Sequence, residues 1–253
     1  MNILFTICGR AGSKGIKSKN SKKFLEHPLP FYTFSVIDLF MVEHPEYECD
    51  IVLNTDSDQL MNIAKKFHKD IILQERQESL AGDSAPKVAV IADCLEQMQK
   101  KKDKIYDMVV DLDLTSPLRT KKDLEALIEK KQEKDYDVVF SVTESRRNPY
   151  FNMVKKAGDY CEKVIASDFT ARQQAPEMFD MNASLYAYSP EFLKSGKAIF
   201  DGKCGMIHMY DTGILDLDHE NDFVLMEVIA KYLVGTNEAF SEIEKHIFEC
   251  CKL

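Results

Sequence analysis

Short apolar runs alternate with stretches of helical periodicity along the first half of the chain. Residues 3–7, 51–54, 71–73 and 108–112 are predicted strands, and residues 31–40, 60–67 and 88–98 are predicted helices. The run at 108–112 is nearly all apolar, as is typical of a parallel strand buried on both faces. Repeated strand–helix units of this kind predict an α/β fold with a parallel sheet.

The regular alternation of strands and helices ends after a further predicted strand at residues 138–142. Thr120 with Asp123 predicts a helix cap before that strand. Residues 143–180 are predicted to form a protruding arm or dimerisation element, with short strands at 151–154 and 160–164. The chain then returns to the core with predicted strands at 184–188 and 205–210, a helix at 222–233 and a last helix from about residue 241.

The segment that follows the first strand, residues 8–20, has the composition of a phosphate-binding loop. Glycines allow the backbone to approach a ligand, while Arg10, Lys14 and Lys19 supply positive charge. Ser13 stands where an ATPase loop needs glycine, and Ala11 stands where a dinucleotide loop needs it. The position beyond the end of a strand favours a ligand site over a basic surface loop, and a nucleoside triphosphate suits its chemistry.

Composition limits the classes of function. The 253 residues, 45% of them hydrophobic, are enough for one large domain, taken here as residues 1–253. A net charge of −9 disfavours nucleic acid, and no apolar run is long enough to span a membrane. Seven scattered cysteines indicate neither a disulfide framework nor a zinc motif, so we expect a cytoplasmic protein.

Two pairs of carboxylates have the spacing of metal ligands. Asp216 and Asp218 would point to the same side of an extended segment, which suits Mg²⁺ bound together with substrate phosphates. Asp111 and Asp113 end the strand at 108–112 and could face the same ligand. A pair of this kind is also common as solvated or capping carboxylates.

Several motifs together resemble the acylneuraminate cytidylyltransferase (CMP-sialic acid synthetase) family over most of the chain. The longest are Gly9 to Asn20, which is similar to the family opening A-R-x-G-S-K-G-I-x-x-K-N, and Asp113 to Thr120, which is similar to Q-P-T-S-P-L-R-T. Further matches are Thr55-Asp56, Arg76, Leu80 to Asp83, Arg172 to Pro176, Asn182 before Tyr186, and Leu215 to Asp218.

The resemblance implies a three-layer, Rossmann-like nucleotidyltransferase fold with a mostly parallel central sheet and a protruding dimerisation arm. It also implies that the anomeric hydroxyl of a 2-keto sugar acid attacks the α-phosphorus of CTP, giving a CMP-sugar and pyrophosphate, with Mg²⁺ as cofactor and a homodimer as the assembly. The implied catalytic residues are Arg10, Lys14, Lys19 and Arg172; the nucleotide-binding residues are Arg10, Gly12, Ser13, Asn20, Arg76, Ala85 and Lys87; the sugar-binding residues are Asp113, Gln174, Asn182 and Tyr186; and the metal ligands are Asp216 and Asp218.

Some positions in this presumed site depart from the family pattern. Asp113 replaces the usual Gln, Ala85 and Lys87 stand where serines are common, and Ala183 replaces the Gly that follows Asn. Because a carboxylate cannot donate a hydrogen bond, Asp113 could select a differently substituted sugar of the legionaminic or pseudaminic type, or help to hold a metal. The alternatives are a nucleotidyltransferase that uses another triphosphate or a sugar phosphate, a glycosyltransferase, and a non-catalytic nucleotide- or sugar-binding protein.

Overall fold

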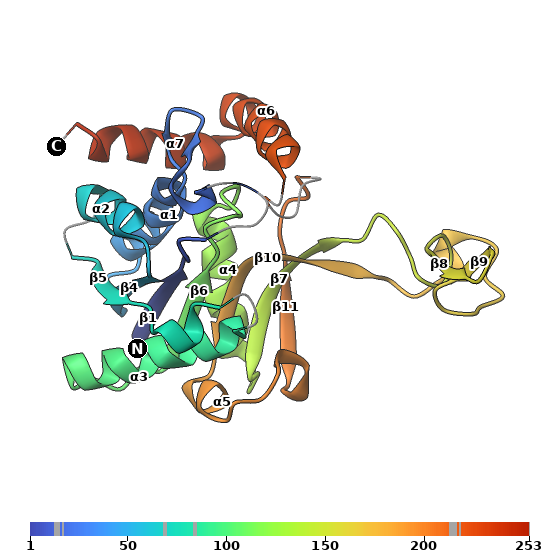
Figure 1. Ribbon diagram of the computed structural model, residues 1–253, viewed down its shortest axis with the longest axis horizontal. Helices are drawn as coiled ribbons and strands as arrows, with labels where there is room; N and C mark the ends of the chain where they lie inside the picture. The colour runs from blue at the N-terminus through green and yellow to red at the C-terminus, as the bar shows by residue number, and fades with distance from the viewer. Residues whose placement is uncertain are drawn as a thin grey trace.

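A central sheet organises the molecule. The computed structural model describes residues 1–12, 16, 18–67, 70–82, 85–212, 217 and 219–252. In this part of the chain a seven-stranded sheet has the strand order β11-β7-β10-β6-β1-β4-β5 (Figure 1). Its strands are β1 Asn2–Cys8, β4 Glu48–Thr55, β5 Ile72–Glu75, β6 Met108–Leu112, β7 Val138–Glu144, β10 Phe179–Tyr188 and β11 Cys204–His208. Every neighbouring pair is parallel except those made by β10, which is antiparallel to both β6 and β7, so the prediction of a mostly parallel sheet is confirmed.

Helices cover both faces of this sheet and complete three layers (Figure 1). One face carries α1 Pro30–Glu43, α2 Asp58–Phe67, α4 Lys121–Glu133, α6 Glu220–Thr236 and α7 Glu238–Cys250, and the other carries α3 Lys87–Lys102 and the short α5 Pro190–Lys194. Among the described residues, no helix is both long and apolar enough to cross a membrane.

The alternation of side chains along β1 determines which of its residues face the helices on each side of the sheet. Ile3, Phe5 and Ile7 are fully buried in the larger core, under α1 and α2. Leu4 is buried in the second core, under α3, and Cys8 packs against that same core. Because side chains alternate along a strand, Thr6 also points toward α3. The polar residues near the end of β1 therefore lie on the α3 side of the sheet.

The sequence predicted most of these elements within a few residues. The predicted cap at Thr120 is confirmed, since its side chain accepts a hydrogen bond from the amide of Asp123 while the Asp123 carboxylate accepts one from the amide of Thr120. The strand predicted at 151–154 is wrong, because residues 151 and 152 lie in turns and β8 is Val154–Ala157. Several short elements have no clear signal in the sequence. They are α5, the strands β2 Lys23–Phe24 and β3 His27–Pro28, and the 3-10 turns Lys19–Ser21, Glu78–Leu80, Arg172–Gln174 and Ile199–Asp201.

A two-stranded arm projects from the body of the protein. It consists of β8 and β9 (Tyr160–Lys163), which pair antiparallel at the end of an extension of β7 and β10 (Figure 1). Apolar side chains lie open on it, since Val154 is 64% exposed and Tyr160 is 83% exposed. The arm is well placed to contact another molecule.

A bulge interrupts β10 where it passes β7. The pairing register shifts between Met181 and Tyr186. Ala183, inside the bulge, has a φ of 49°, in the left-handed region that favours glycine. On the β6 side, next to the pair Leu185 and Leu112, the carbonyl of Ser184 accepts a hydrogen bond of 3.1 Å from the amide of Asp113.

Candidate active site

A cavity of about 300 Å³ opens beyond the carboxyl end of β1, where ligands of open α/β sheets bind. The first strand, the loop after it, the segment after β5, the start of α3 and the loop after β6 all contribute to its walls. Its lining residues are Cys8, Arg10, Gly12, Lys19, Asn20, Arg76, Leu80, Gly82, Ala85, Lys87, Val90, Asp113 and Thr115. Four cationic side chains against one carboxylate make this cavity suitable for a polyanion.

A larger groove of about 890 Å³ lies between α3 and α5. Its walls are mainly apolar and include Val88, Leu95, Leu193 and Phe200. Since it lacks the convergent cations of the smaller cavity, we assign the phosphate chemistry to the smaller one.

Hydrogen bonds hold the loop after β1 in place. The side-chain amide of Asn20 donates to the carbonyl of Arg10 at 3.1 Å, and the amide of Ala11 donates to Asp56 Oδ1 at 2.6 Å. A Cβ on Gly9 would lie 2.7 Å from side-chain atoms of both Leu60 and Leu114, so this position has no room for a side chain. The loop is thus fixed against its neighbours at its start.

Arg76 enters the cavity from the segment after β5 and is held by β4. Its Nε donates to Asn54 Oδ1 at 2.7 Å, and one of its terminal nitrogens donates to the backbone carbonyl of Asn54 at 3.2 Å. Asn54 is fully buried near the end of β4. The guanidinium is therefore oriented before any ligand arrives.

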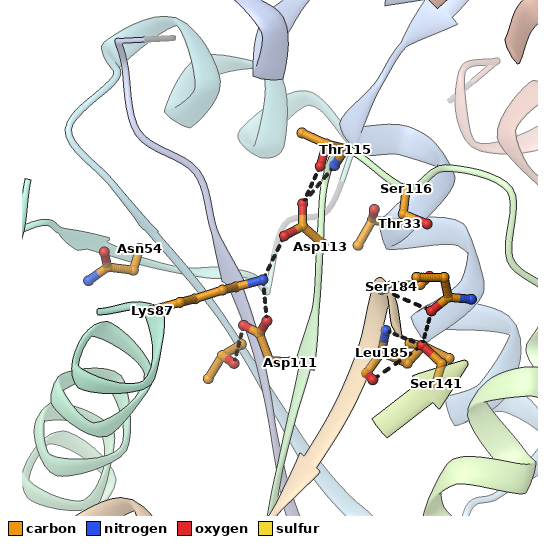
Figure 2. Close-up of polar contacts among 12 residues, drawn as sticks. Thr33, Asn54, Lys87, Asp111, Asp113, Thr115, Ser116, Ser141, Ser184 and Leu185 are labelled. Carbon is orange, nitrogen blue, oxygen red and sulfur yellow. Dashed lines mark hydrogen bonds and ion pairs between the residues drawn. The ribbon is translucent and has the colours of Figure 1, made fainter. Parts of the chain in front are cut away.

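Lys87 joins the two carboxylates of β6 and the loop that follows it. It is the first residue of α3, and its Nζ lies 2.8 Å from Asp111 Oδ2 and 2.7 Å from Asp113 Oδ2 (Figure 2). Asp111 is fully buried and also accepts a hydrogen bond of 2.9 Å from Thr6 Oγ1. Asp113 accepts two more through Oδ1, from the amide and the hydroxyl of Thr115. The alternation of side chains along β1 and β6 explains this cluster, because it directs both Thr6 and Asp111 toward α3.

These contacts shift the pKa values of the pair strongly. Burial alone would raise the pKa of Asp113, but the Lys87 ammonium and the hydrogen bonds from Thr115 hold it well below its ordinary value of 3.8. Burial alone would lower the pKa of Lys87, but the charges of Asp111 and Asp113 raise it well above its ordinary value. Both groups of the pair are therefore charged at neutral pH.

A buried arginine holds the loop that carries Asp113. The Arg119 side chain is fully buried, and its guanidinium donates to the backbone carbonyls of Asp113 and Ser116 and, at 3.1 Å, to that of Ser184. Burial lowers its pKa to about 10, so it stays charged. The positions of the loop after β6 and of the bulge in β10 are thereby fixed together.

The cavity contains eight of the predicted site residues. These are Arg10, Gly12, Lys19, Asn20, Arg76, Ala85, Lys87 and Asp113. Tyr186 lies beside them, with its ring centre 5.6 Å from Lys87 Nζ. Ser13, Lys14, Asp216 and Asp218 lie outside the described residues. Leu217, between the two predicted metal ligands, is described: it is fully buried, and its carbonyl accepts a hydrogen bond from Lys19.

Two predicted sugar-binding residues, Asn182 and Gln174, and the predicted catalytic residue Arg172 do not line this cavity. Asn182 is buried, and its Oδ1 accepts a hydrogen bond from the hydroxyl of Ser141 on β7. Arg172 is near the base of the arm and donates to the carbonyl of Ser145 at 2.9 Å. The side-chain oxygen of Gln174 accepts from the amide and hydroxyl of Thr170 within a local turn. In this conformation the three residues stabilise the polypeptide around the arm.

Two residues that orient side chains or loops of the site, Asn54 and Arg119, were not predicted from the sequence to have that role. Asn54 was predicted only as the end of a strand, although a polar amide at the end of an apolar strand is itself a signal. Arg119 was recognised only as part of a motif. Its role could not be derived from spacing, because it acts through the backbone of a distant strand.

Comparison with known proteins agrees with this geometry. Residues 4–211 match the model of the cytidylyltransferase family, so the chain belongs to that family and is a nucleotidyltransferase. It is 33% identical over 229 residues to the post-translational flagellin modification protein B of Campylobacter coli, with 90% of this chain and 95% of that one covered. It is also 33% identical over 227 residues to the CMP-N,N'-diacetyllegionaminic acid synthase of Campylobacter jejuni, covering 90% and 94%. Identity to the pseudaminic acid cytidylyltransferase of the same species is 30% over 245 residues, covering 95% and 100%.

The fold has close counterparts among solved structures. A CMP:2-keto-3-deoxy-manno-octonic acid synthetase solved in complex with CTP superposes with a TM-score of 0.64, covering 92% of this chain and 98% of that one. The sequence identity is 12%, so this likeness concerns the fold. The expected Rossmann-like nucleotidyltransferase architecture is confirmed.

Proposed function

We propose that this enzyme transfers the cytidylyl group of CTP to a sugar acid of the legionaminic type and releases pyrophosphate. The observation that carries the proposal is the cavity beyond β1, where Arg10, Lys19, Arg76 and Lys87 converge on one space. The family supplies the cytidylyl transfer, and the convergent cations suit the triphosphate. In this reaction the anomeric oxygen of the sugar bonds to the α-phosphorus, the bond to the β-phosphate oxygen breaks, and pyrophosphate leaves.

The nucleotide occupies the side of the cavity formed by the loop after β1. Arg10, Lys14, Lys19 and Asn20 neutralise and orient the phosphates, which is the main source of catalysis when no covalent intermediate forms. Arg76, preset by Asn54, faces the nucleoside near Ala85. Gly12 lines the same wall, and nothing in the described part of the chain lies within 4 Å of the Cβ that a larger residue would place there.

The sugar acid enters from the side of Lys87 and Asp113. Asp113 offers acceptor oxygens to hydroxyl or amide N–H groups of the sugar, and Lys87 balances its charge. The legionaminic type is preferred because a relative with that printed activity is 33% identical to this chain. Pseudaminic acid is the second candidate, on the strength of the relative that is 30% identical.

Asp216 and Asp218 are the proposed ligands of Mg²⁺. Lys19, which lines the cavity, donates a hydrogen bond to the carbonyl of Leu217, so the residue between the two proposed ligands lies beside the proposed phosphate site. Two carboxylates together with substrate phosphates are a ligand set that Mg²⁺ prefers. When bound, the ion would neutralise charge on the phosphates and make pyrophosphate a better leaving group.

We also propose a homodimer in which the arm reaches the partner's active site. The exposed apolar residues of β8 and β9 support a contact of this kind. Arg172, with Gln174 beside it, then provides the sugar carboxylate with a bidentate partner in the neighbouring subunit, and Asn182 and Tyr186 lie on the sugar side of their own subunit. Mixing Arg172→Ala and Asp216→Ala chains tests this arrangement. If the mixture of the two inactive variants regains activity, the arrangement is supported. If the mixture stays inactive, the arrangement is contradicted.

Pyrophosphate release is the decisive assay. The enzyme is incubated with Mg²⁺, each of CTP, UTP, ATP and GTP, and a panel of legionaminic, pseudaminic, sialic and deoxyoctulosonic acids. Release of pyrophosphate with CTP and legionaminic acid supports the proposal. A preference for another acid contradicts the proposed sugar, and a preference for another triphosphate contradicts the proposed nucleotide.

Lys19→Ala is expected to lower kcat/KM at least about 100-fold. Lys23→Ala is the matched control, because Lys23 is exposed in the same basic segment and does not line the cavity.

A further inference from the structure

A cluster of mixed donor atoms lies between α1 and α7, on residues other than those that line the nucleotide cavity. Asp38 comes from α1, and His246 and Cys250 come from consecutive turns of α7. One ligand atom from each residue lies within 4.8 Å of those of the other two. All three residues are partly buried, and Asp38 Oδ1 has no exposure to solvent.

One pair in the cluster has nearly the separation of two ligands in a tetrahedral metal site. Cys250 Sγ lies 3.7 Å from His246 Nε2. A tetrahedral Zn²⁺ with bonds of about 2.0 Å to nitrogen and about 2.3 Å to sulfur separates such atoms by roughly 3.5 Å. Residues four apart on a helix share one face, so this pair can reach a common ion with little movement of the backbone.

Ser35 supports the orientation of the histidine ring. Its hydroxyl lies 3.1 Å from His246 Nδ1, one turn before Asp38 on α1. With the Nδ1 proton directed to Ser35, Nε2 keeps its lone pair for an ion. Cys250 Sγ lies 3.7 Å from Nε2 and 3.9 Å from Nδ1, so the thiol would rotate about its Cα–Cβ bond to share that ion. Histidine ligands are commonly fixed in this way by a hydrogen bond to their second ring nitrogen.

The donor set selects the class of ion. Sulfur, imidazole nitrogen and carboxylate oxygen together suit Zn²⁺, whereas Mg²⁺ prefers oxygen ligands. A bound divalent ion displaces the thiol proton of Cys250 and balances the charges of the thiolate and of the Asp38 carboxylate.

We propose that Asp38, His246 and Cys250 form a Zn²⁺ site, with water as fourth ligand, that joins the last helix to α1. Because α1 packs directly on the sheet, the ion would tie the end of the chain to the core. This site is separate from the Mg²⁺ site proposed for catalysis, and it does not depend on the proposed reaction.

Cobalt substitution tests the site directly in the full chain. Metal-free protein is titrated with Co²⁺, whose spectrum reports four-coordinate geometry and a thiolate-to-metal charge-transfer band, and then with Zn²⁺ as competitor. The wild type is expected to bind one equivalent with both signals. Cys250→Ser should lose the charge-transfer band and bind at least about tenfold more weakly, since even changes beyond the ligands themselves weaken metal sites by this factor.

Cys251→Ser is the matched control, because Cys251 is the adjacent cysteine, is exposed and lies outside the cluster. It should retain the band and the affinity of the wild type. A band that persists in Cys250→Ser or disappears in Cys251→Ser overturns the proposal, as does a wild type without the signals. Thermal unfolding provides a second measurement. Zn²⁺ should raise the Tm of the wild type and of Cys251→Ser but not that of Asp38→Asn, and an equal rise in Asp38→Asn contradicts the assigned ligand set.

Discussion

The ammonium group of Lys87 lies 2.7 Å from Asp113 Oδ2, so two residues expected to contact different substrates contact each other. The same nitrogen is 2.8 Å from the buried carboxylate of Asp111. One lysine at the start of α3 therefore compensates two negative charges at the end of β6. The floor of the cavity depends on this lysine for its electrostatic balance.

Lys87→Ala is expected to destabilise the fold because it leaves the buried carboxylate of Asp111 without its cationic partner. The side chain of Lys87 is 35% exposed, so the loss should be roughly 1 to 3 kcal/mol, below that of a fully buried pair. Urea unfolding at neutral pH measures it. Lys100→Ala on the same helix is the control: its partner Glu96 is exposed, and its loss should stay below about 0.5 kcal/mol. Equal losses in the two variants would show that the cluster has no special role.

Lowering the pH should reveal how much the ionised Asp113 carboxylate contributes to the free energy of unfolding. Because its pKa in the folded protein lies below the ordinary value of 3.8, the unfolded chain binds the proton first as the pH falls. The ionised carboxylate thus stabilises the fold above about pH 3.8, and this stabilisation is lost as the pH falls through the folded pKa. Urea unfolding of wild type and Asp113→Asn is compared between pH 3 and 6. Their stability difference should be constant near pH 6 and shrink below pH 4, and parallel curves throughout would be inconsistent with this pKa shift.

Asn54→Ala should weaken the binding of CTP, on the basis of the proposed function. The variant leaves Arg76 Nε without the acceptor that lies 2.7 Å away, so only the bond to the backbone carbonyl of residue 54 orients the guanidinium before the ligand arrives. A lost hydrogen bond to a charged group corresponds to roughly a tenfold rise in KM, with kcat within about twofold. Steady-state kinetics measure both constants. Asn62→Ala, on the exposed surface of α2, should change neither.

Two glycines of the loop after β1 should respond in opposite ways to alanine. Gly9→Ala places a Cβ 2.7 Å from side-chain atoms of Leu60 and Leu114, and overpacking of this kind typically costs about 1 to 3 kcal/mol. Gly12→Ala should fold normally, since no described atom lies within 4 Å of the added carbon. Thermal unfolding of the two variants gives the comparison. A Gly9→Ala protein as stable as Gly12→Ala would contradict the close packing at the start of the loop.

Ala183→Gly should stabilise the protein. Ala183 has a φ of 49°, which costs a residue with a side chain about 1 to 2 kcal/mol, while glycine loses only part of that gain through its greater freedom when unfolded. A net gain of about 0.5 to 1 kcal/mol in the free energy of unfolding is expected. Ala187→Gly, in the regular and buried part of the same strand, should be destabilising. A loss in both variants would show that the methyl group of Ala183 contributes more than its backbone conformation costs.

The sequence predicted the elements of this fold whose signal is local. β1 and β6 were recognised because each is a nearly continuous apolar run, and the Thr120 cap was recognised because both partners lie three residues apart. The antiparallel insertion of β10 between β6 and β7 joins segments far apart in the chain, and periodicity contains no information on that pairing.

The same limit applies within the site. Arg10, Lys19, Arg76 and Asp113 were identified from motifs, and the structure brings these four into one cavity. That Lys87 neutralises both Asp111 and Asp113 follows from where the start of α3 meets the end of β6, a tertiary relationship. Arg119 likewise acts through the carbonyls of Asp113 and Ser184, which no pattern of side chains reveals.

The place of β10 in the sheet has a consequence for the order in which the molecule assembles. Every described residue that lines the cavity precedes residue 116, yet β6 keeps an unpaired edge until β10 inserts beside it. That insertion brings the Ser184 carbonyl to the amide of Asp113 and to Arg119. Contacts between such distant segments form slowly and late in folding. We therefore expect a nascent chain that ends before β10 to contain all the described lining residues but to lack the hydrogen bonds to β10 that fix the loop bearing Asp113.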